Sequence, residues 1–205
     1  LVEKLIETFK LDKGSWVLDP FCGGGTTLLA CKELGINSTG FDILPFSVFL
    51  SNVKVRTYDP RKLRQQLENF GKAKGRIPKG ASLPDVVIAN KAFNEDVERE
   101  LLRLKYKINA IRNPKMRDFY MLGLLSILES VSNTSKSGGF LRITPRKVSG
   151  KDVLPKYLAR IEAMISDVEK FNDTLKFPKT KTAAELSDSR QFSVPRKFDA
   201  IITSP

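Results

Sequence analysis

Residues 17–27 have the sequence VLDPFCGGGTT, and this stretch decides the fold. The apolar run that leads into it predicts a short buried strand ending at Asp19. Three glycines follow, and TTLLACKEL after them places apolar side chains at helical spacing up to Gly35, a residue typical of a helix end. We therefore expect a strand, a glycine turn and a helix in direct succession.

The neighbouring segments extend this pattern. Residues 1–9, LVEKLIETF, predict a helix with Leu1, Leu5, Ile6 and Phe9 on one face. After the glycine helix, NSTGFDI predicts a second strand that ends at Asp42, and PFSVFLSNVKV predicts a second helix with Pro45 in its first turn. Strands alternating with helices specify a parallel sheet in an α/β fold, where ligands bind at the carboxyl ends of the strands.

The glycine turn and Asp42 together suggest a nucleoside site. Glycines between a strand and a helix allow close approach of a ligand to the backbone and leave N-terminal N–H groups of the helix for an anion. Asp42 ends the next strand about twenty residues on, where an acid accepts hydrogen bonds from ribose hydroxyls. The glycines do not fit the dinucleotide pattern GxGxxG. The alternative is a tight turn that binds nothing.

Composition bounds the function classes. The chain has 205 residues, 41% hydrophobic and 28% charged, enough for a core and one or two domains. It has two cysteines, Cys22 and Cys31, and no histidine, which excludes histidine base catalysis and disfavours a metal site or a disulfide framework. No membrane-length apolar run or signal-peptide pattern is present, so we expect a cytoplasmic protein, with both cysteines structural.

The positive charge is concentrated in the middle of the chain. The net charge is +12, and the segment from Lys54 to Lys179 holds 27 basic and 14 acidic side chains, which accounts for the whole excess. Such a segment is expected to face a polyanion, although a solvated basic surface without a partner is the alternative.

The middle segment also interrupts the strand–helix pattern. We expect a core formed by residues 1–53 and 181–205, and an inserted, basic, mainly helical subdomain at residues 54–180. RKLRQQLENF, NEDVERELLRLKYKI, MRDFYMLGLLSILESV and VLPKYLARIEAMISDVEKF predict its helices. The predicted buried faces of the second and fourth helices comprise Val97, Leu101, Leu104 and Ile108, and Leu154, Leu158, Ile161, Ile165 and Val168.

The stretch LDPFCGGGTT resembles the cofactor motif DPFxGxGTT of the amino-methylating DNA methyltransferases. This resemblance implies a Rossmann-like fold that binds S-adenosylmethionine. It assigns cofactor contacts to the motif itself, to GFDILPF and to AELSDSRQF, in which Asp188 would accept from the adenine amine. The residues concerned are Asp19, Pro20, Phe21, Cys22, Gly23, Gly25, Thr26, Thr27, Asp42, Ile43, Asp188 and Ser189.

The final residues, IITSP, resemble the start of the family's Thr-Ser-Pro-Pro-Tyr motif. A buried strand from Ile201 to Thr203 is expected to lead into it, with the chain truncated inside the catalytic motif and also missing an edge of the cofactor site before its first residue. By this resemblance Ser204 accepts a hydrogen from the target amine, and a carbonyl near Pro205 accepts the other. Serine before the proline favours the N4 amine of cytosine over the N6 amine of adenine.

Two basic stretches are candidates for DNA phosphate contacts. A loop, SKSGGFLRITPRKVSGK, contains Lys136, Arg142, Arg146, Lys147 and Lys151. The stretch KYKINAIRNPKMR contains Lys105, Lys107, Arg112, Lys115 and Arg117. Either stretch could instead be an ordinary solvated surface.

The resemblance therefore implies a methyltransferase that acts on double-stranded DNA with the target base flipped out, without a metal or a covalent enzyme intermediate. A restriction–modification setting follows from it, with a cognate restriction endonuclease or a completing polypeptide as possible partners. Two alternatives stay open. One is an RNA methyltransferase, and the other is a cofactor-binding or DNA-binding fragment that is inactive without its missing end or a partner.

Overall fold

The structure is a computed structural model that describes residues 1–72, 75–83, 91–137, 140–144, 148–175, 179–191, 193, 194 and 196–203. The side chains of residues 71, 72, 136, 137, 140 and 141 are outside that description. The chain forms two compact units, one of residues 1–58 with 169–205 and the other of residues 59–168. Each is considered by itself.

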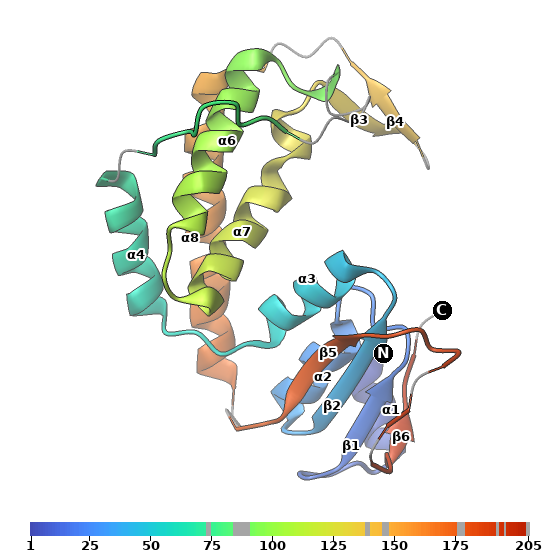
Figure 1. Ribbon diagram of the computed structural model, residues 1–205. Coiled ribbons are helices and arrows are strands. Elements are labelled where there is room, and N and C mark those ends of the chain that lie inside the picture. Colours follow the sequence, from blue (N-terminus) through green and yellow to red (C-terminus); the bar gives the residue numbers. More distant parts are fainter. Residues whose placement is uncertain are drawn as a thin grey trace. The chain divides into compact units, whose positions relative to one another are not determined.

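The first unit contains a four-stranded parallel sheet, so the expected α/β class with a parallel sheet is confirmed. The order is β5 (Thr182–Leu186), β2 (Asn37–Asp42), β1 (Trp16–Asp19) and β6 (Ala200–Ile201). Helices α1 (Val2–Thr8), α2 (Thr26–Leu34) and α3 (Pro45–Val55) form one layer against the sheet, and α2 contacts both other helices (Figure 1).

Local sequence explains these helices. Glycine 35 ends α2 in the left-handed conformation, with φ of +80°, and Pro45 occupies the first turn of α3, both as the sequence predicts. The helices bury their apolar faces against the sheet. One core cluster contains Ile6, Val17, Cys31, Ile36 and Ile202.

Two predictions for this unit are wrong in part. Leu1 and Phe9 are 93% and 51% exposed, whereas the predicted residues Leu5 and Ile6 pack in the core together with Val2. The expected strand from Ile201 to Thr203 is observed as Ala200–Ile201. Ile201 is 63% exposed, whereas Ile202, the residue after β6, is buried, because successive residues of an extended chain face opposite sides of a sheet.

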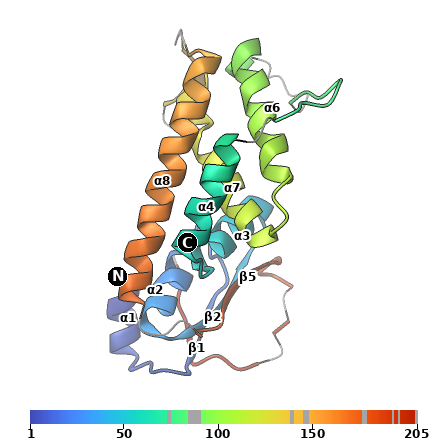
Figure 2. The ribbon, with the colours of Figure 1, turned by 90° about the vertical axis from the view of Figure 1, so that its left-hand side faces the viewer.

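The second unit is mainly helical. It contains α4 (Pro60–Lys72), α6 (Glu95–Asn109), α7 (Pro114–Ile127), the 3₁₀ turn η1 (Glu129–Val131) and most of α8 (Gly150–Thr174), whose last residues belong to the first unit (Figures 1 and 2). None of the helices in the described parts of the chain is long and apolar enough to cross a membrane.

Aromatic side chains build the core of the second unit. Phe70 of α4 packs on Tyr120 of α7 and Tyr157 of α8, with ring centroids 5.8 Å and 5.5 Å apart. The Tyr120 hydroxyl donates to the Leu63 carbonyl at 2.8 Å, and the Tyr157 hydroxyl donates to the Tyr120 carbonyl at 3.2 Å. Both buried phenols are therefore hydrogen-bonded, which removes the cost of burying their polar ends.

The predicted buried face is confirmed for α6 and is wrong in part for α8. The four apolar residues predicted for α6 are all buried. In α8 the buried residues include Val153 and Tyr157, while Leu154 is 38% exposed, so the prediction for its first turns is wrong. Tyr157 fills the aromatic core in these turns, whereas Ile161 and Ile165, both on the predicted face, are buried.

The predicted basic loop contains a hairpin. Strands β3 (Thr134–Ser137) and β4 (Phe140–Ile143) pair antiparallel, with Ser135 opposite Arg142. The base of the hairpin is anchored by side chains from outside it. The Asn133 amide donates to Asn94 Oδ1 at 2.8 Å, and the Asn94 amide donates to the Val148 carbonyl at 3.1 Å.

Candidate functional site at the carboxyl ends of the strands

Three parallel strands end at the same edge of the sheet. In the strand register Asp19 lies opposite Gly40, and Asp42 lies opposite Leu186. The segments that follow β1, β2 and β5 therefore leave the sheet side by side. Far-separated parts of the sequence meet at this edge.

The glycine turn is held in shape by α3. The Gly25 N–H donates to the Cys22 carbonyl at 2.7 Å, and Gly23 and Gly25 have φ of +47° and +76°. The Ser51 hydroxyl donates to the Gly23 carbonyl, and the Lys54 ammonium donates to the Gly24 carbonyl, both at 2.8 Å. Two turn carbonyls are thereby fixed on the α3 side.

Asp42 joins the turn to the second strand. Its Oδ2 accepts from the Gly23 N–H at 2.9 Å, and its Oδ1 accepts from the Leu44 N–H at 2.8 Å. The side chain is only half-buried. An ionised carboxylate has about four acceptor positions, so acceptor capacity remains on both oxygens. This arrangement can accept hydrogen bonds from a pair of neighbouring hydroxyl groups.

Large apolar side chains are exposed around this carboxylate. Phe21, Ile43, Phe46 and Leu186 are each between 55% and 64% exposed, and all belong to the segments that leave these strand ends. Exposed apolar side chains gathered beside a polar anchor are typical of a ligand site. A flat apolar ring and a hydroxylated sugar, the parts of a nucleoside, fit these side chains and Asp42.

The residues predicted to contact a cofactor divide into two groups. The exposed or half-exposed ones are Pro20, Phe21, Gly23, Thr26, Asp42, Ile43, Asp188 and Ser189. The buried ones are Asp19, Cys22, Gly25 and Thr27. Asp19 is 3% exposed and accepts from the Phe21 N–H at 3.1 Å, so its carboxylate shapes the turn from beneath.

Both cysteines are buried thiols. Burial, with a further effect of the nearby Asp19 carboxylate, raises the pKa of Cys22 to about 11. Burial raises the pKa of Cys31 to about 12. Neither thiol is ionised at neutral pH, and the thiolate is the reactive form.

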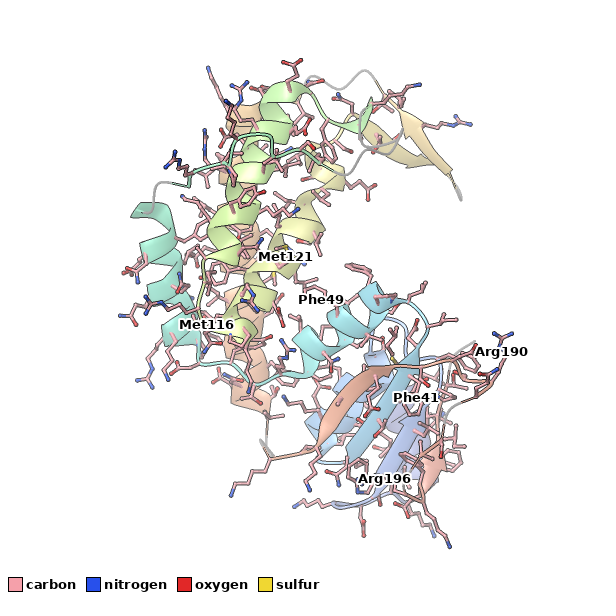
Figure 3. The ribbon with its side chains drawn as sticks, in the orientation of Figure 1. Phe41, Phe49, Met116, Met121, Arg190 and Arg196 are labelled. Carbon is pink, nitrogen blue, oxygen red and sulfur yellow. The ribbon has the colours of Figure 1, made fainter. Side chains whose placement is uncertain are left out.

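Asp188 has a partner that the sequence did not indicate. The Arg190 guanidinium donates to both carboxylate oxygens, through Nε at 3.0 Å and Nη2 at 2.6 Å, and these bonds lower the pKa of Asp188 to about 2. The Arg190 side chain extends from the segment after β5 (Figure 3). An amine that reaches Asp188 must share this carboxylate with Arg190.

The segment after β5 also contacts the other two strand ends. The Ser189 hydroxyl donates to the Pro20 carbonyl, and the Ser187 N–H donates to the Asp42 carbonyl at 3.1 Å. Asp188 is therefore held close to the glycine turn, although about 170 residues separate them in sequence. At the opposite end of β1, Arg196 stacks on Trp16 (Figure 3).

Sequence reasoning missed Ser51, Lys54 and Arg190. All three act through contacts with residues of the predicted motifs, and nothing in their local sequence signals this.

The predicted catalytic residues Ser204 and Pro205 lie outside the described residues. The strand before them is described, and the Ile202 N–H donates to the Leu18 carbonyl at 2.9 Å. Thus β6 runs beside β1 toward the edge that carries the glycine turn.

Most predicted DNA contacts lie on the surface of the second unit. Arg112, Lys115, Arg142 and Lys151 are exposed, and Arg117 is half-buried. Lys136 lies on β3, with its side chain outside the description, and Arg146 and Lys147 lie outside the described residues. Among the residues that the structure describes, no group of three or more His, Cys, Asp or Glu side chains could hold a metal ion.

Comparisons with known proteins agree with this geometry. A family model described as DNA methylase, for N6 and N4 methyltransferases, matches residues 1–51. The type II methyltransferase M.BsoBI of Geobacillus stearothermophilus is 31% identical over 236 residues, covering 100% of this chain and 46% of the relative. M.AvaI of Nostoc sp., also a type II methyltransferase, is 30% identical over 164 residues, covering 76% of this chain and 33% of the relative.

A third relative, the type II methyltransferase M.MjaII of Methanocaldococcus jannaschii, is 33% identical over 109 residues, covering 52% of this chain and 21% of the relative. The chain thus spans less than half the length of these curated relatives. No solved structure matches it.

Proposed function

Since the chain belongs to the N6/N4 DNA methylase family of amino-methyltransferases, we propose that it forms part of an S-adenosylmethionine-dependent DNA methyltransferase of a type II restriction–modification system. S-Adenosylmethionine supplies an electrophilic methyl group in such a reaction. The acceptor is an exocyclic amine of a base in double-stranded DNA. A cognate restriction endonuclease is the partner that this setting predicts.

The first unit is proposed to be a Rossmann-like methyltransferase core. Its parallel order supports this, because β2 and β5 are added on one side of β1 and β6 on the other, so the strand order reverses beside β1. Ligands of open α/β sheets bind at such a position, outside the carboxyl ends of the strands. The glycine turn follows β1 at this place.

The observation that carries the proposal is the position of Asp42. Its carboxylate is fixed by two backbone N–H groups, one from the glycine turn, and stays half-exposed beside apolar side chains. In the proposed complex Asp42 accepts from both ribose hydroxyls, while Ile43 and Phe21 pack on the adenine ring. Asp188 accepts from the adenine amine in competition with Arg190.

The target amine requires help from the chain, because its lone pair is delocalised into the base. We assign this role to Ser204, whose hydroxyl accepts one amine hydrogen, and to a carbonyl near Pro205, which accepts the other. These contacts would direct the lone pair at the methyl group. Serine at this position favours cytosine N4 over adenine N6.

The basic second unit is proposed to contact the DNA backbone. Its exposed cations include Arg142 near the end of β4, opposite Ser135, and Lys151 at the start of α8. Between Glu129 and Asp152 the sequence contains no acidic residue, which supports a phosphate-contacting role for this stretch. Lys136, Arg146 and Lys147 belong to the same stretch, and Arg112, Lys115 and Arg117 form the second candidate set.

A methyl-transfer assay tests the proposal. The chain is incubated with methyl-labelled S-adenosylmethionine and duplex DNA, and the nucleosides are separated by chromatography after digestion. We expect label in N4-methylcytosine. Label in N6-methyladenine would keep the reaction class and overturn the base preference, whereas label transferred only to RNA would overturn the DNA assignment.

A matched pair of serine variants tests the assigned role of Ser204. Ser204→Ala should lower the transfer rate by about a hundredfold, the usual effect of losing one electrostatic contact to the reacting group, without weakening cofactor binding. Ser193→Ala, an exposed serine on the segment after β5, should leave the rate unchanged. Equal rates in the two variants would contradict the role of Ser204.

A further inference from the structure

The second unit contains a hollow in which the predicted DNA contact Arg112 lies beside residues of two other segments. It has a volume of about 410 Å³ and lies between α4 and the turn that joins α6 to α7. Phe70 and Ile111, which are 2% and 6% exposed, form its apolar floor. Polar side chains of Gln66, Asn69, Lys107, Arg112 and Asn113 line the rest.

Lys107 is held in a fixed position in this hollow. Its ammonium donates to the Phe70 carbonyl at 3.0 Å and lies 4.9 Å from the centre of the Phe70 ring. A lysine ammonium has three N–H donors, so this bond leaves two for other partners. The side chain is half-buried, and its burial lowers the pKa of Lys107, with a further effect of the nearby Arg103 charge.

The other polar groups also present donors. Arg112 is exposed at the rim and adds a second cation. Asn113 Oδ1 accepts from the Met116 N–H at 3.2 Å as the cap of α7, which leaves the NH₂ group of Asn113 available. No carboxylate lines the hollow among the residues that the structure describes. The lining therefore favours an anion.

These features match a sugar–phosphate unit better than a base. A phosphodiester offers only oxygen acceptors, which the ammonium, guanidinium and amide donors can bind, and the carbon face of a deoxyribose suits the Phe70 and Ile111 floor. A base edge presents donors as well as acceptors, and among the lining side chains the acceptors for them are the amide oxygens of Gln66 and Asn69, since the Asn113 oxygen caps α7.

We propose that this hollow binds a phosphodiester of duplex DNA, with Lys107 and Arg112 contacting the phosphate. This assignment rests on the proposed function, because it takes the second unit to be the DNA-contacting part of the protein. It places Lys107 and Arg112 of the second basic stretch at one hollow and adds the amide side chains of Gln66 and Asn69. The contact fixes the position of the DNA backbone and reads no sequence.

Charge-removing variants and a salt titration test the site. The affinity of the chain for short fluorescein-labelled duplexes of two unrelated sequences is measured by fluorescence anisotropy at several salt concentrations. Arg112→Gln and Lys107→Gln should each weaken binding several-fold, equally for both duplexes. Each variant should also reduce the slope of log affinity against log salt, by at most about 0.9, the value for one neutralised phosphate.

Arg61→Gln is the matched control. Arg61 lies on α4, where its side chain is 94% exposed and 3.7 Å from Asp59, and it is not among the residues of the hollow. This variant removes the same charge and should change the slope less than Arg112→Gln does. Because Arg112 is exposed, its replacement should leave the melting temperature unchanged, so a loss of affinity is not a loss of folding.

The outcomes separate this inference from the proposed function. If the wild-type chain binds DNA and both variants behave like Arg61→Gln, the hollow is not a phosphate site and the proposed function stands. If the losses differ between the two duplexes, the site reads bases and the backbone assignment is wrong. If the wild-type chain binds S-adenosylmethionine but no duplex DNA at low salt, both the inference and the DNA substrate are overturned.

Discussion

Gly25 shows how one residue sets the geometry of the glycine turn. Its φ of +76° is a conformation that favours glycine, and a Cβ atom there would lie 2.7 Å from Ser51 Oγ and 2.9 Å from Ser51 Cβ. The absent side chain thus allows α3 to approach the turn. Ser51 uses this approach to donate to the Gly23 carbonyl.

We expect Gly25→Ala to destabilise the protein by about 2–4 kcal/mol, from backbone strain and overpacking together. Chemical denaturation measures this change. Gly80→Ala is the control, because Gly80 has φ of +80° and nothing within 4 Å of the added atom. Equal losses in the two variants would show that the contact with Ser51 contributes nothing.

The sequence identifies Gly25 and Asp42 as site residues, but it does not identify the residues from other segments that contact this site. The glycine motif and the spacing to Asp42 are local features of the chain, so both residues were predicted. Ser51 and Arg190 act through contacts that exist only after α3 and the segment following β5 pack at the strand ends. Exposed Phe46 was likewise unassigned, because sequence does not show which apolar residues stay outside the core.

At the scale of elements, Lys32 links α2 to the end of α3. Its side chain is 2% exposed, and the ammonium donates to the Val55 carbonyl and to the Thr57 hydroxyl, the latter at 2.9 Å. Burial disfavours the charged form and lowers the pKa of Lys32 to about 8 from 10.5. A cation at the last carbonyl of a helix also interacts favourably with the helix dipole.

This burial predicts a pH dependence of stability. Between pH 8 and 10.5 the unfolded chain holds a proton on Lys32 that the folded chain has released, so the contribution of Lys32 to stability rises with pH in this window. The rise is at most about 1.4 kcal/mol per pH unit. Below pH 8 both states are protonated, and the contribution is constant.

Lys32→Met isolates this effect. The difference in unfolding free energy between wild type and Lys32→Met should shift in favour of wild type as pH rises from 8 to 10.5. Taking the difference cancels the opposite contributions of Cys22 and Cys31, whose raised pKa values make folding less favourable at high pH. A difference that does not change with pH would mean that Lys32 titrates normally.

The sequence predicts helices well where the helical spacing of apolar residues alone decides which side chains are buried. Helix α3 has the bounds that its sequence pattern indicates, and all four predicted core residues of α6 are buried. The prediction is wrong for the first turns of α8, because Tyr157 belongs to an aromatic core that aliphatic spacing does not reveal. The β3–β4 hairpin was missed because Thr134–Ser137 has no alternation of apolar residues.

At the scale of the whole molecule, the candidate cofactor site and the candidate DNA-contacting cations lie in different units. The candidate nucleoside site lies in the first unit, and the exposed cations Arg112, Arg142 and Lys151 lie in the second. The sequence indicated this division through its concentrated positive charge. It could not show the hollow at Lys107, which forms only when α4 packs beside the α6–α7 turn.

This division predicts different salt responses for the two ligands. Affinity for duplex DNA should fall steeply with salt, by about 0.9 in the log–log slope for each phosphate contacted. Affinity for S-adenosylmethionine should change little over the same range, because hydrogen bonds to Asp42 and apolar packing dominate it. Parallel titrations by anisotropy and calorimetry measure both, and equal slopes would contradict separate sites.

The central claim is that Asp42 and the glycine turn form the S-adenosylmethionine site, and calorimetric titration with this cofactor tests it most directly. Wild type and Glu7→Gln, an exposed carboxylate on α1 changed in the same way, should bind with equal affinity. Asp42→Asn should bind at least about tenfold more weakly, as expected when a charged hydrogen-bond acceptor is lost. Equal binding by all three proteins, or no binding by the folded wild-type chain, would contradict the claim.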